Sequence, residues 1–459
     1  MNPATAWAER EVAALREQDA AHVWHPLLNH RSLAKSPLSV MVQARGCTVT
    51  DAGGKSYIDA MAGLWCVNIG YGRKEVAEAA YRQLLELPYY PLTQINPPAA
   101  RLAAKLAEIL PKGVSRVWFV NSGSEAVDTA LKIARAWGKL RGGRHKIIAR
   151  YQGYHGATIG GASLTGQTHR RRQFEPLLPG IIHVQAPYFY RSGARTEEEL
   201  AARCAEELDA VIRYQGPDTV AAFIAEPVIG GGGVIPPPAD YLKRMREVCT
   251  RYGVLMICDE VITGFGRTGE MFASDLYGVR PDVMTLAKGL SSAYLPIGAT
   301  AVTEEVFQAL NAEGDPGFLQ INTYGGHPAS CAAALKNLEI LAGEDLCANA
   351  RKVGARLGAA LARLRDIPSV GDVRGVGLIW GVELVEEDGA PLGNDAVGRI
   401  LRYAREEGVI LGKNAGIADG PSNTITISPP LVITGAEADR VVEVLGAALR
   451  RHMSERTGG

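Results

Sequence analysis

The sequence lacks the features that mark several classes of protein. It has 49 Lys plus Arg and 49 Asp plus Glu, so no excess charge would attract nucleic acid or an acidic membrane surface. Its seven cysteines are scattered without a CxxC pair, which argues against a zinc or redox centre, and we expect no metal. No apolar run reaches membrane-spanning length, and the N-terminal MNPATAWAEREVAALREQ is too charged for a signal peptide. We therefore expect a cytoplasmic protein with no nucleic-acid or membrane partner.

The arrangement of apolar patterns along the 459 residues predicts an α/β protein with a second, smaller lobe. Residues 1–60 read as a helix and a hairpin, an N-terminal segment contributing to the small domain. Over residues 61–325, strand-like runs alternate with helical patterns, which predicts a large domain with a mainly parallel sheet. Residues 326–459 are expected to form an α+β lobe, the C-terminal small domain.

Four apolar runs in the middle of the chain end at polar residues. They are 117–120 before Asn121, 220–225 before Glu226, 254–258 before Asp259, and 283–287 before Lys288. Ligands of open α/β sheets bind beyond the carboxyl ends of the strands, so we expect these groups to converge. Lys288 lies in an otherwise apolar stretch, where a lysine is rarely buried without a partner.

The segment NSGSEAVDTALKIARAW, which begins at Asn121, predicts the start of a helix. Ser122 and Glu125 have the spacing of a capping box, and a plain cap would explain Ser122 by itself. The backbone N–H groups of Gly123 and Ser124 would also lie at the positive end of the helix dipole. That position favours phosphate binding.

Asp259 and Lys288 together suggest a cofactor. A lysine that forms an imine with an aldehyde, an aspartate on a cationic ring nitrogen and a phosphate site are what pyridoxal phosphate requires. Burial would help to keep the Lys288 amine deprotonated, because desolvation disfavours its charged form. The alternative is that Asp259 caps the turn that follows its strand.

With these residues assembled, the chain resembles the class III pyridoxal-phosphate aminotransferases, in the branch of ω-amino acid, diamine, amine:pyruvate and taurine:pyruvate transaminases. The resemblance covers nearly the whole length. Six motifs occur in the family's order, namely NSGSEAVDT, YQGYHGAT, EPVIGGGGVI, CDEVITGFGRTG, AKGLSSAYLPIGA and NTYGGHP. AGLWCVNIGYGR at 62–73 is characteristic of the ω-transaminase branch. The resemblance implies the fold-type I architecture and an active site shared across a homodimer, or a dimer of dimers.

The resemblance also implies three catalytic residues. Lys288 would be the Schiff-base lysine and would carry a proton between the substrate carbon and the cofactor. Asp259 would hold the pyridine nitrogen protonated. Glu226 would lie on the side of the ring hydroxyl, where a structural role is an alternative.

Further residues that bind the cofactor follow from the same motifs. Gly123 and Ser124 would bind the phosphate. Tyr154 would stack on one face of the ring, and Val261 would pack on the other. Thr323 would reach the phosphate of the neighbouring subunit.

The substrate pocket of the branch corresponds to Trp65, Leu27 and Tyr89, although Leu27 is equally well explained as a core residue. Gly231 lies in the glycine run 230–233, where the lack of a side chain would leave a roomier pocket. The branch usually carries an arginine before its SPPL strand that binds a substrate carboxylate. Residues 411–431 contain no arginine, and Lys413 is the only cation there.

The function that the resemblance implies is transamination between a primary amine and a keto acid such as pyruvate, by a ping-pong Schiff-base mechanism. The amine would be an ω-amine, a diamine or an ω-amino acid. Two alternatives are a pyridoxal-phosphate aminomutase of the same family and a catalytically silent binding protein on this fold.

Overall fold

The structure is a computed structural model, which describes residues 7–32, 38–314, 317–414, 416, 418 and 420–457. At its centre lies a seven-stranded sheet in the order β4-β10-β9-β8-β7-β5-β6. The neighbouring strands β9, β8, β7, β5 and β6 are parallel to one another, whereas β10 is antiparallel to both β4 and β9. The mainly parallel sheet expected from the sequence is therefore confirmed. Its strands are β4 (Val114–Val120), β5 (Lys146–Arg150), β6 (Ile181–Val184), β7 (Val220–Ala225), β8 (Leu255–Asp259), β9 (Val283–Leu286) and β10 (Gly298–Thr303).

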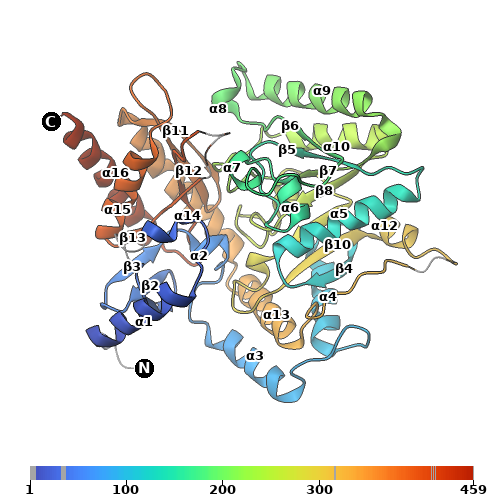
Figure 1. Cartoon of the computed structure of the whole chain (residues 1–459), viewed down its shortest axis with the longest axis horizontal. Coiled ribbons are helices and arrows are strands. Elements are labelled where there is room, and N and C mark those ends of the chain that lie inside the picture. The colour runs from blue at the N-terminus through green and yellow to red at the C-terminus, as the bar shows by residue number, and fades with distance from the viewer. Residues whose placement is uncertain are drawn as a thin grey trace.

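Helices cover both faces of this sheet (Figure 1). On one face α9 (Glu197–Gln215) and α10 (Tyr241–Tyr252) pack against alternate strand residues such as Phe223, and on the other α5 (Gly123–Lys139) packs against residues such as Ile224. Both side chains are fully buried. Coverage of both faces explains why the strands read as continuous apolar runs.

Two smaller sheets flank the central one. The first has the order β1-β2-β3-β13 and joins β3 in parallel to β13, so the first 60 residues share a sheet with the C-terminal part. The second has the order β11-β12-β15-β14. The domain boundaries at 60 and 325 stay predictions. The strands are β1 (Met41–Arg45), β2 (Thr48–Asp51), β3 (Ser56–Asp59), β11 (Val370–Val376), β12 (Ile379–Leu384), β13 (Val409–Ile410), β14 (Gly412–Lys413) and β15 (Thr424–Ile427).

The remaining helices connect and cover these sheets (Figure 1). No helix in the described ranges is both long and apolar enough to cross a lipid bilayer. The α-helices are α1 (Glu9–His22), α2 (Ala62–Trp65), α3 (Lys74–Glu86), α4 (Pro97–Ile109), α6 (Ile159–Leu164), α7 (Thr168–Arg171), α8 (Phe189–Ser192), α11 (Ala273–Leu276), α12 (Glu304–Ala309), α13 (Pro328–Gly343), α14 (Leu346–Ala362), α15 (Asn394–Glu406) and α16 (Gly435–Thr457). Short 3-10 turns are η1 (His30–Ser32), η2 (Pro217–Thr219), η3 (Lys288–Leu290) and η4 (Arg363–Asp366).

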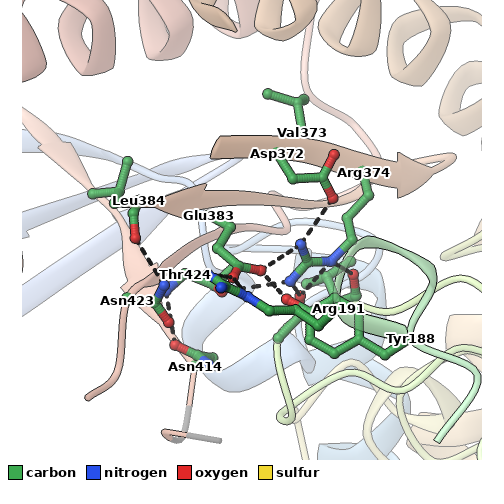
Figure 2. Close-up of polar contacts among 12 residues, drawn as sticks. Tyr188, Arg191, Asp372, Val373, Arg374, Glu383, Leu384, Asn414, Asn423 and Thr424 are labelled. Atoms are coloured by element: carbon green, nitrogen blue, oxygen red, sulfur yellow. Dashed lines mark hydrogen bonds and ion pairs between the residues drawn. The ribbon is translucent and has the colours of Figure 1, made fainter. Parts of the chain in front are cut away.

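A buried carboxylate on β12 joins the C-terminal sheet to the loop that follows β6 (Figure 2). Glu383 has no exposed side-chain surface. It accepts hydrogen bonds from the Tyr188 hydroxyl, from Arg191 Nε at 2.8 Å and from Arg374 Nη1 at 2.8 Å. Two guanidinium groups thus compensate a charge that would be costly to bury by itself.

Arg374, on β11, extends this link to a glycine-rich loop of the large domain. Its Nε donates to the carbonyl of Val234 at 2.8 Å, and its Nη2 donates to that of Gly233 at 2.7 Å. Its Nη1 also pairs with Asp372 at 3.0 Å. Both loop residues have a positive φ, +119° at Gly233 and +50° at Val234, so the arginine holds a turn that few sequences adopt unaided.

We predict that Arg374→Met lowers the free energy of unfolding by about 3 kcal/mol, because it leaves buried carboxylate charge and two carbonyl groups without their donor. Urea denaturation of the holoenzyme measures the change. Arg356→Met is the matched control, because Arg356 pairs with Asp439 on the surface, with 59% of its side chain exposed. Equal midpoints for the two variants would show that the link does not stabilise the fold.

Candidate active site

Asp259, the last residue of β8, is held by three hydrogen bonds. Its Oδ2 lies 2.8 Å from Nδ1 of His155, and its Oδ1 accepts from Thr285 Oγ1 at 2.9 Å and from Val261 N at 3.2 Å. Asp259 and His155 are both buried. A carboxylate fixed in this way could hold a cationic nitrogen in one orientation. The bond to Val261 N makes Asp259 a turn cap, whereas its role on a ring nitrogen stays a prediction.

Lys288 follows β9 directly and opens the turn η3. Its φ is +46°, in the left-handed region that is strained for a residue with a side chain. Within the described ranges, its Nζ donates no hydrogen bond and forms no ion pair. Burial lowers the pKa of the amine, against the opposing charges of Cys66, Asp259 and Glu226. The structure therefore presents a partly buried amine that has no partner, next to two carboxylates.

Glu226 follows β7 and binds the backbone on both sides of the site. Its Oε1 accepts from Tyr154 N at 2.9 Å, and its Oε2 accepts from Gly230 N at 2.9 Å. Burial raises the pKa of this carboxyl. Because both oxygens are occupied by backbone donors, these contacts favour a structural role for Glu226 over a chemical one.

The start of α5 has the expected cap. The Ser122 hydroxyl accepts from Glu125 N at 3.2 Å. The Glu125 carboxylate accepts from Asn121 N at 2.7 Å, one residue before the position that a capping box uses. The cap leaves the N–H groups of Gly123 and Ser124 in the first turn of the helix.

Close packing around this turn requires glycine. A Cβ on Gly123 would lie 2.8 Å from Val261 Cγ1 and 3.4 Å from the Ala287 side chain. A Cβ on Gly156 would lie 2.8 Å from Ser124 Oγ, which accepts from Ala157 N at 3.0 Å. The helix start, Val261 two positions after Asp259, and Ala287 directly before Lys288 thus meet at one place, as the strand ends predicted.

The glycine run 230–233 forms one wall beside Tyr154. A Cβ on Gly231 would find only Gln167 Nε2 at 3.5 Å and Tyr154 Cβ at 3.8 Å, which are ordinary contacts. A Cβ on Gly230 would meet Ile262 at 2.7 Å, and one on Gly232 would meet the Gln152 carbonyl at 2.2 Å. Gly231 is therefore the position in this run where a methyl group would have room.

Trp65 packs at the other end of the same loop. Its ring lies against the buried cluster of Val234, Ile262 and Ile379. Its φ is +57°, and its indole Nε1 is buried without an acceptor in the structure as described. Because Arg374 holds the carbonyl of Val234, the position of Trp65 depends on the C-terminal sheet as well.

The other expected pocket residues lie at the surface of this chain. The Tyr89 hydroxyl donates to the Thr323 carbonyl at 2.8 Å, which brings these two residues together. The side chain of Leu27 is 79% exposed. Lys413 is exposed on β14, where it lies opposite Ile425. The roles of all four residues stay predictions.

Pyridoxal phosphate fits the residues that meet here. The unpaired Lys288 amine, the fixed Asp259 carboxylate and a helix start that is free of side-chain bulk at Gly123 match its aldehyde, ring nitrogen and phosphate. Among the described residues, no group of three or more His, Cys, Asp or Glu side chains is placed to hold a metal ion.

Sequence reasoning missed two residues that fix Asp259. His155 lies within the GYHG motif, but a single histidine gave no reason to pair it with an acid 104 positions away. Thr285 lies inside a buried strand, where the sequence gave no signal of a polar contact. The register of β8 beside β9 brings Thr285 to Asp259, and the packing of the loop after β5 brings His155 there.

Comparisons with known proteins agree with this geometry. The family model "Aminotransferase class-III" matches residues 31–449. An uncharacterized aminotransferase, YhxA of Bacillus subtilis, is 45% identical, over 94% of this chain and 95% of the relative. Putrescine–pyruvate aminotransferase of Pseudomonas aeruginosa is 40% identical, over 92% of both chains. Taurine–pyruvate aminotransferase of Bilophila wadsworthia is 39% identical, over 94% of this chain and 95% of the relative.

Solved structures give the same result. A Bacillus anthracis aminotransferase superposes with a TM-score of 0.93 at 44% identity, over 97% of this chain and all of the other. The ω-transaminase of Pseudomonas jessenii in complex with PMP superposes with a TM-score of 0.90 at 38% identity, over 96% of this chain and 98% of the other.

We predict that Gly123→Ala weakens the binding of pyridoxal phosphate about tenfold or more, because the new methyl group must displace Val261. Overpacking of this kind costs about 1–3 kcal/mol. Gly231→Ala is the matched control, because its methyl group meets only ordinary contacts. Titration of the apoenzyme, followed by visible absorbance, measures both affinities. Equal affinity in the two variants would show that the helix start does not receive the phosphate.

Proposed function

The chain belongs to the class-III aminotransferase family, and from this premise we propose that it moves an amino group from an ω-amine or diamine to pyruvate. The general reaction, pyridoxal-phosphate-dependent transfer between a primary amine and a keto acid, follows from the family. The choice of pyruvate and of a terminal amine is our proposal. It is supported by relatives named for putrescine and taurine as donors and pyruvate as acceptor.

The unpaired Lys288 amine is the observation that carries this proposal. Pyridoxal phosphate, when bound, supplies the aldehyde that takes up the amino group and a ring that accepts electrons. Lys288 Nζ, with its lowered pKa, would take a proton from the substrate carbon and return it. Asp259 would hold the ring nitrogen in its protonated form, oriented by His155 and Thr285.

The walls of the site support a donor that needs no second charged group. Trp65 contributes an apolar surface, and Gly231 leaves space. Residues 411–431 offer no arginine for a distal carboxylate. We therefore propose that ω-amino acids are not strongly preferred over plain amines of the same length.

The direct test is a single half-reaction of the holoenzyme with an alkylamine. We expect the absorbance of the bound cofactor to change to that of its aminated form, with release of one aldehyde per site, and added pyruvate to restore the first spectrum and yield alanine. Lys288→Ala should lose this turnover, because no other described lysine directly follows the carboxyl end of a strand of the central sheet. An aminomutase would return an isomeric amine without an aldehyde, and a silent binding protein would show no spectral change.

We also propose that the working unit is a homodimer. The segment with Tyr89 and the segment with Thr323 lie together, because the rings of Tyr89 and Tyr324 are 5.9 Å apart. Both segments expose large apolar side chains, which in a soluble protein mark an interaction site. The exposed residues are Tyr89, Tyr90, Leu92, Ile95, Leu319, Ile321 and Tyr324. The resemblance places Thr323 on the partner's phosphate, so a monomer would have an incomplete site.

We predict that Ile321→Asp yields monomers that bind pyridoxal phosphate weakly and turn over at less than a tenth of the wild-type rate, because a carboxylate would be buried at the interface. Light scattering coupled to gel filtration gives the mass of the species that is assayed. Tyr214→Asp is the control, because Tyr214 is 90% exposed on α9. A fully active Ile321→Asp monomer would refute the shared site.

A further inference from the structure

The proposed reaction requires a cation for the carboxylate of the keto acid, and residues 411–431 supply none of the usual kind. An arginine pairs with a carboxylate through two parallel hydrogen bonds, whereas a lysine offers a point charge. Lys413 is exposed on β14. An arginine elsewhere in the site, near Tyr154 and Gly231, could bind this carboxylate.

Arg170, on the short helix α7, lies over Tyr154. Its guanidinium carbon is 4.9 Å from the centre of the Tyr154 ring, and its Nε donates to Gln167 Oε1 at 2.9 Å. Its side chain is partly buried. Among the residues that the structure describes, Nη1 and Nη2 of Arg170 have no acceptor, and the guanidinium has no acidic partner. Both terminal nitrogens of the planar guanidinium are thus left for a ligand.

Gln167 connects Arg170 to the wall of the site. It is 2% exposed, and its Nε2 donates to the Gln152 carbonyl at 2.9 Å. The same Nε2 lies 3.5 Å from the point where a Cβ on Gly231 would be. With its oxygen facing Arg170 and its nitrogen facing Gln152, the amide can support the guanidinium in one orientation only. Arg170 is therefore anchored beside the open position at Gly231.

Three other arginines of this region are already occupied. Arg374 and Arg191 both pair with Glu383 at less than 3 Å. Arg267 is fully buried, and it donates to the carbonyls of Leu378 and Pro429 and to Asn68 Oδ1. A substrate carboxylate could recruit any of these only by breaking a buried contact. Arg170 can bind one without such a loss.

We propose that Arg170 binds the carboxylate of the keto-acid acceptor and so takes the place of the arginine that residues 411–431 lack. The carboxylate would accept from Nη1 and Nη2, while Gln167 and the Tyr154 ring hold the guanidinium in place. An uncharged aldehyde acceptor would not use this contact. The inference rests on the proposed function, because it assigns the acceptor subsite of the same reaction.

The test compares two acceptors that differ by the carboxylate, pyruvate and propanal, each with the aminated form of the holoenzyme. For Arg170→Met we expect the KM for pyruvate to rise about 10- to 100-fold, the range of a charged hydrogen bond, and the KM for propanal to stay within about twofold. The KM of Arg170→Lys for pyruvate should lie between those of wild type and Arg170→Met, because lysine keeps the charge and loses the planar fork. Arg195→Met, at a side chain that is 93% exposed, is the control and should match wild type.

A binding measurement separates this role from a general loss of activity. Calorimetric titration of the aminated holoenzyme with propionate should show weaker binding in Arg170→Met, while propionamide should bind equally to both proteins. An unchanged KM for pyruvate in Arg170→Met would overturn the proposal. If the KM for pyruvate rises in Lys413→Ala instead, the carboxylate site lies on β14. An equal rise in the KM for pyruvate and for propanal would mean that Arg170 only supports Tyr154. Failure of wild type to aminate pyruvate at all would instead contradict the proposed function.

Discussion

The reaction proposed for this protein depends on one partly buried amine that has no partner in the described part of the chain. Lys288 lies among groups that would ordinarily form an ion pair with it, yet its Nζ forms none in the described chain. The two nearby carboxylates are engaged elsewhere, Asp259 by His155 and Thr285 and Glu226 by two backbone N–H groups. An ion pair would hold the proton on Nζ, whereas burial favours the neutral amine. By engaging the neighbouring acids, these hydrogen bonds leave the Lys288 amine unpaired within the described residues.

Strained backbone and close glycine contacts hold the residues around that amine. Lys288 and Trp65 both have a positive φ, which costs about 1–3 kcal/mol each and persists only where the surroundings fix it. Gly123 packs directly against Val261, the residue two positions after Asp259. The cofactor residues are thus fixed by contacts among themselves, and the rigid sheet beneath them offsets the strain.

Four arginines described around Tyr154, Trp65 and the C-terminal sheet differ in what they contact, because Arg374, Arg191 and Arg267 are occupied and the terminal nitrogens of Arg170 are not. Arg374 and Arg191 share Glu383 and connect the C-terminal sheet to the loops of the central one (Figure 2). Arg374 also fixes the turn at Gly233 and Val234, which packs on Trp65. Arg170, by contrast, is oriented by a neutral amide and an aromatic ring, and no acidic side chain pairs with it among the described residues.

The sequence by itself determined the central sheet and the end of each strand that carries a functional group. Continuous apolar runs that stop at Glu226, Asp259 and Lys288 require strands covered on both faces, and the capping pattern at Ser122 required a helix to begin there. The pairing of His155 and Thr285 with Asp259, the free amine of Lys288 and the anchoring of Arg170 by Gln167 were decided only by the tertiary structure. The spacing of apolar residues shows which face of a helix or strand is buried, because the residues of one face are near neighbours along the chain. It cannot record which polar group from a distant strand or loop will fill the remaining hydrogen-bonding positions, because strand order and loop packing set those contacts.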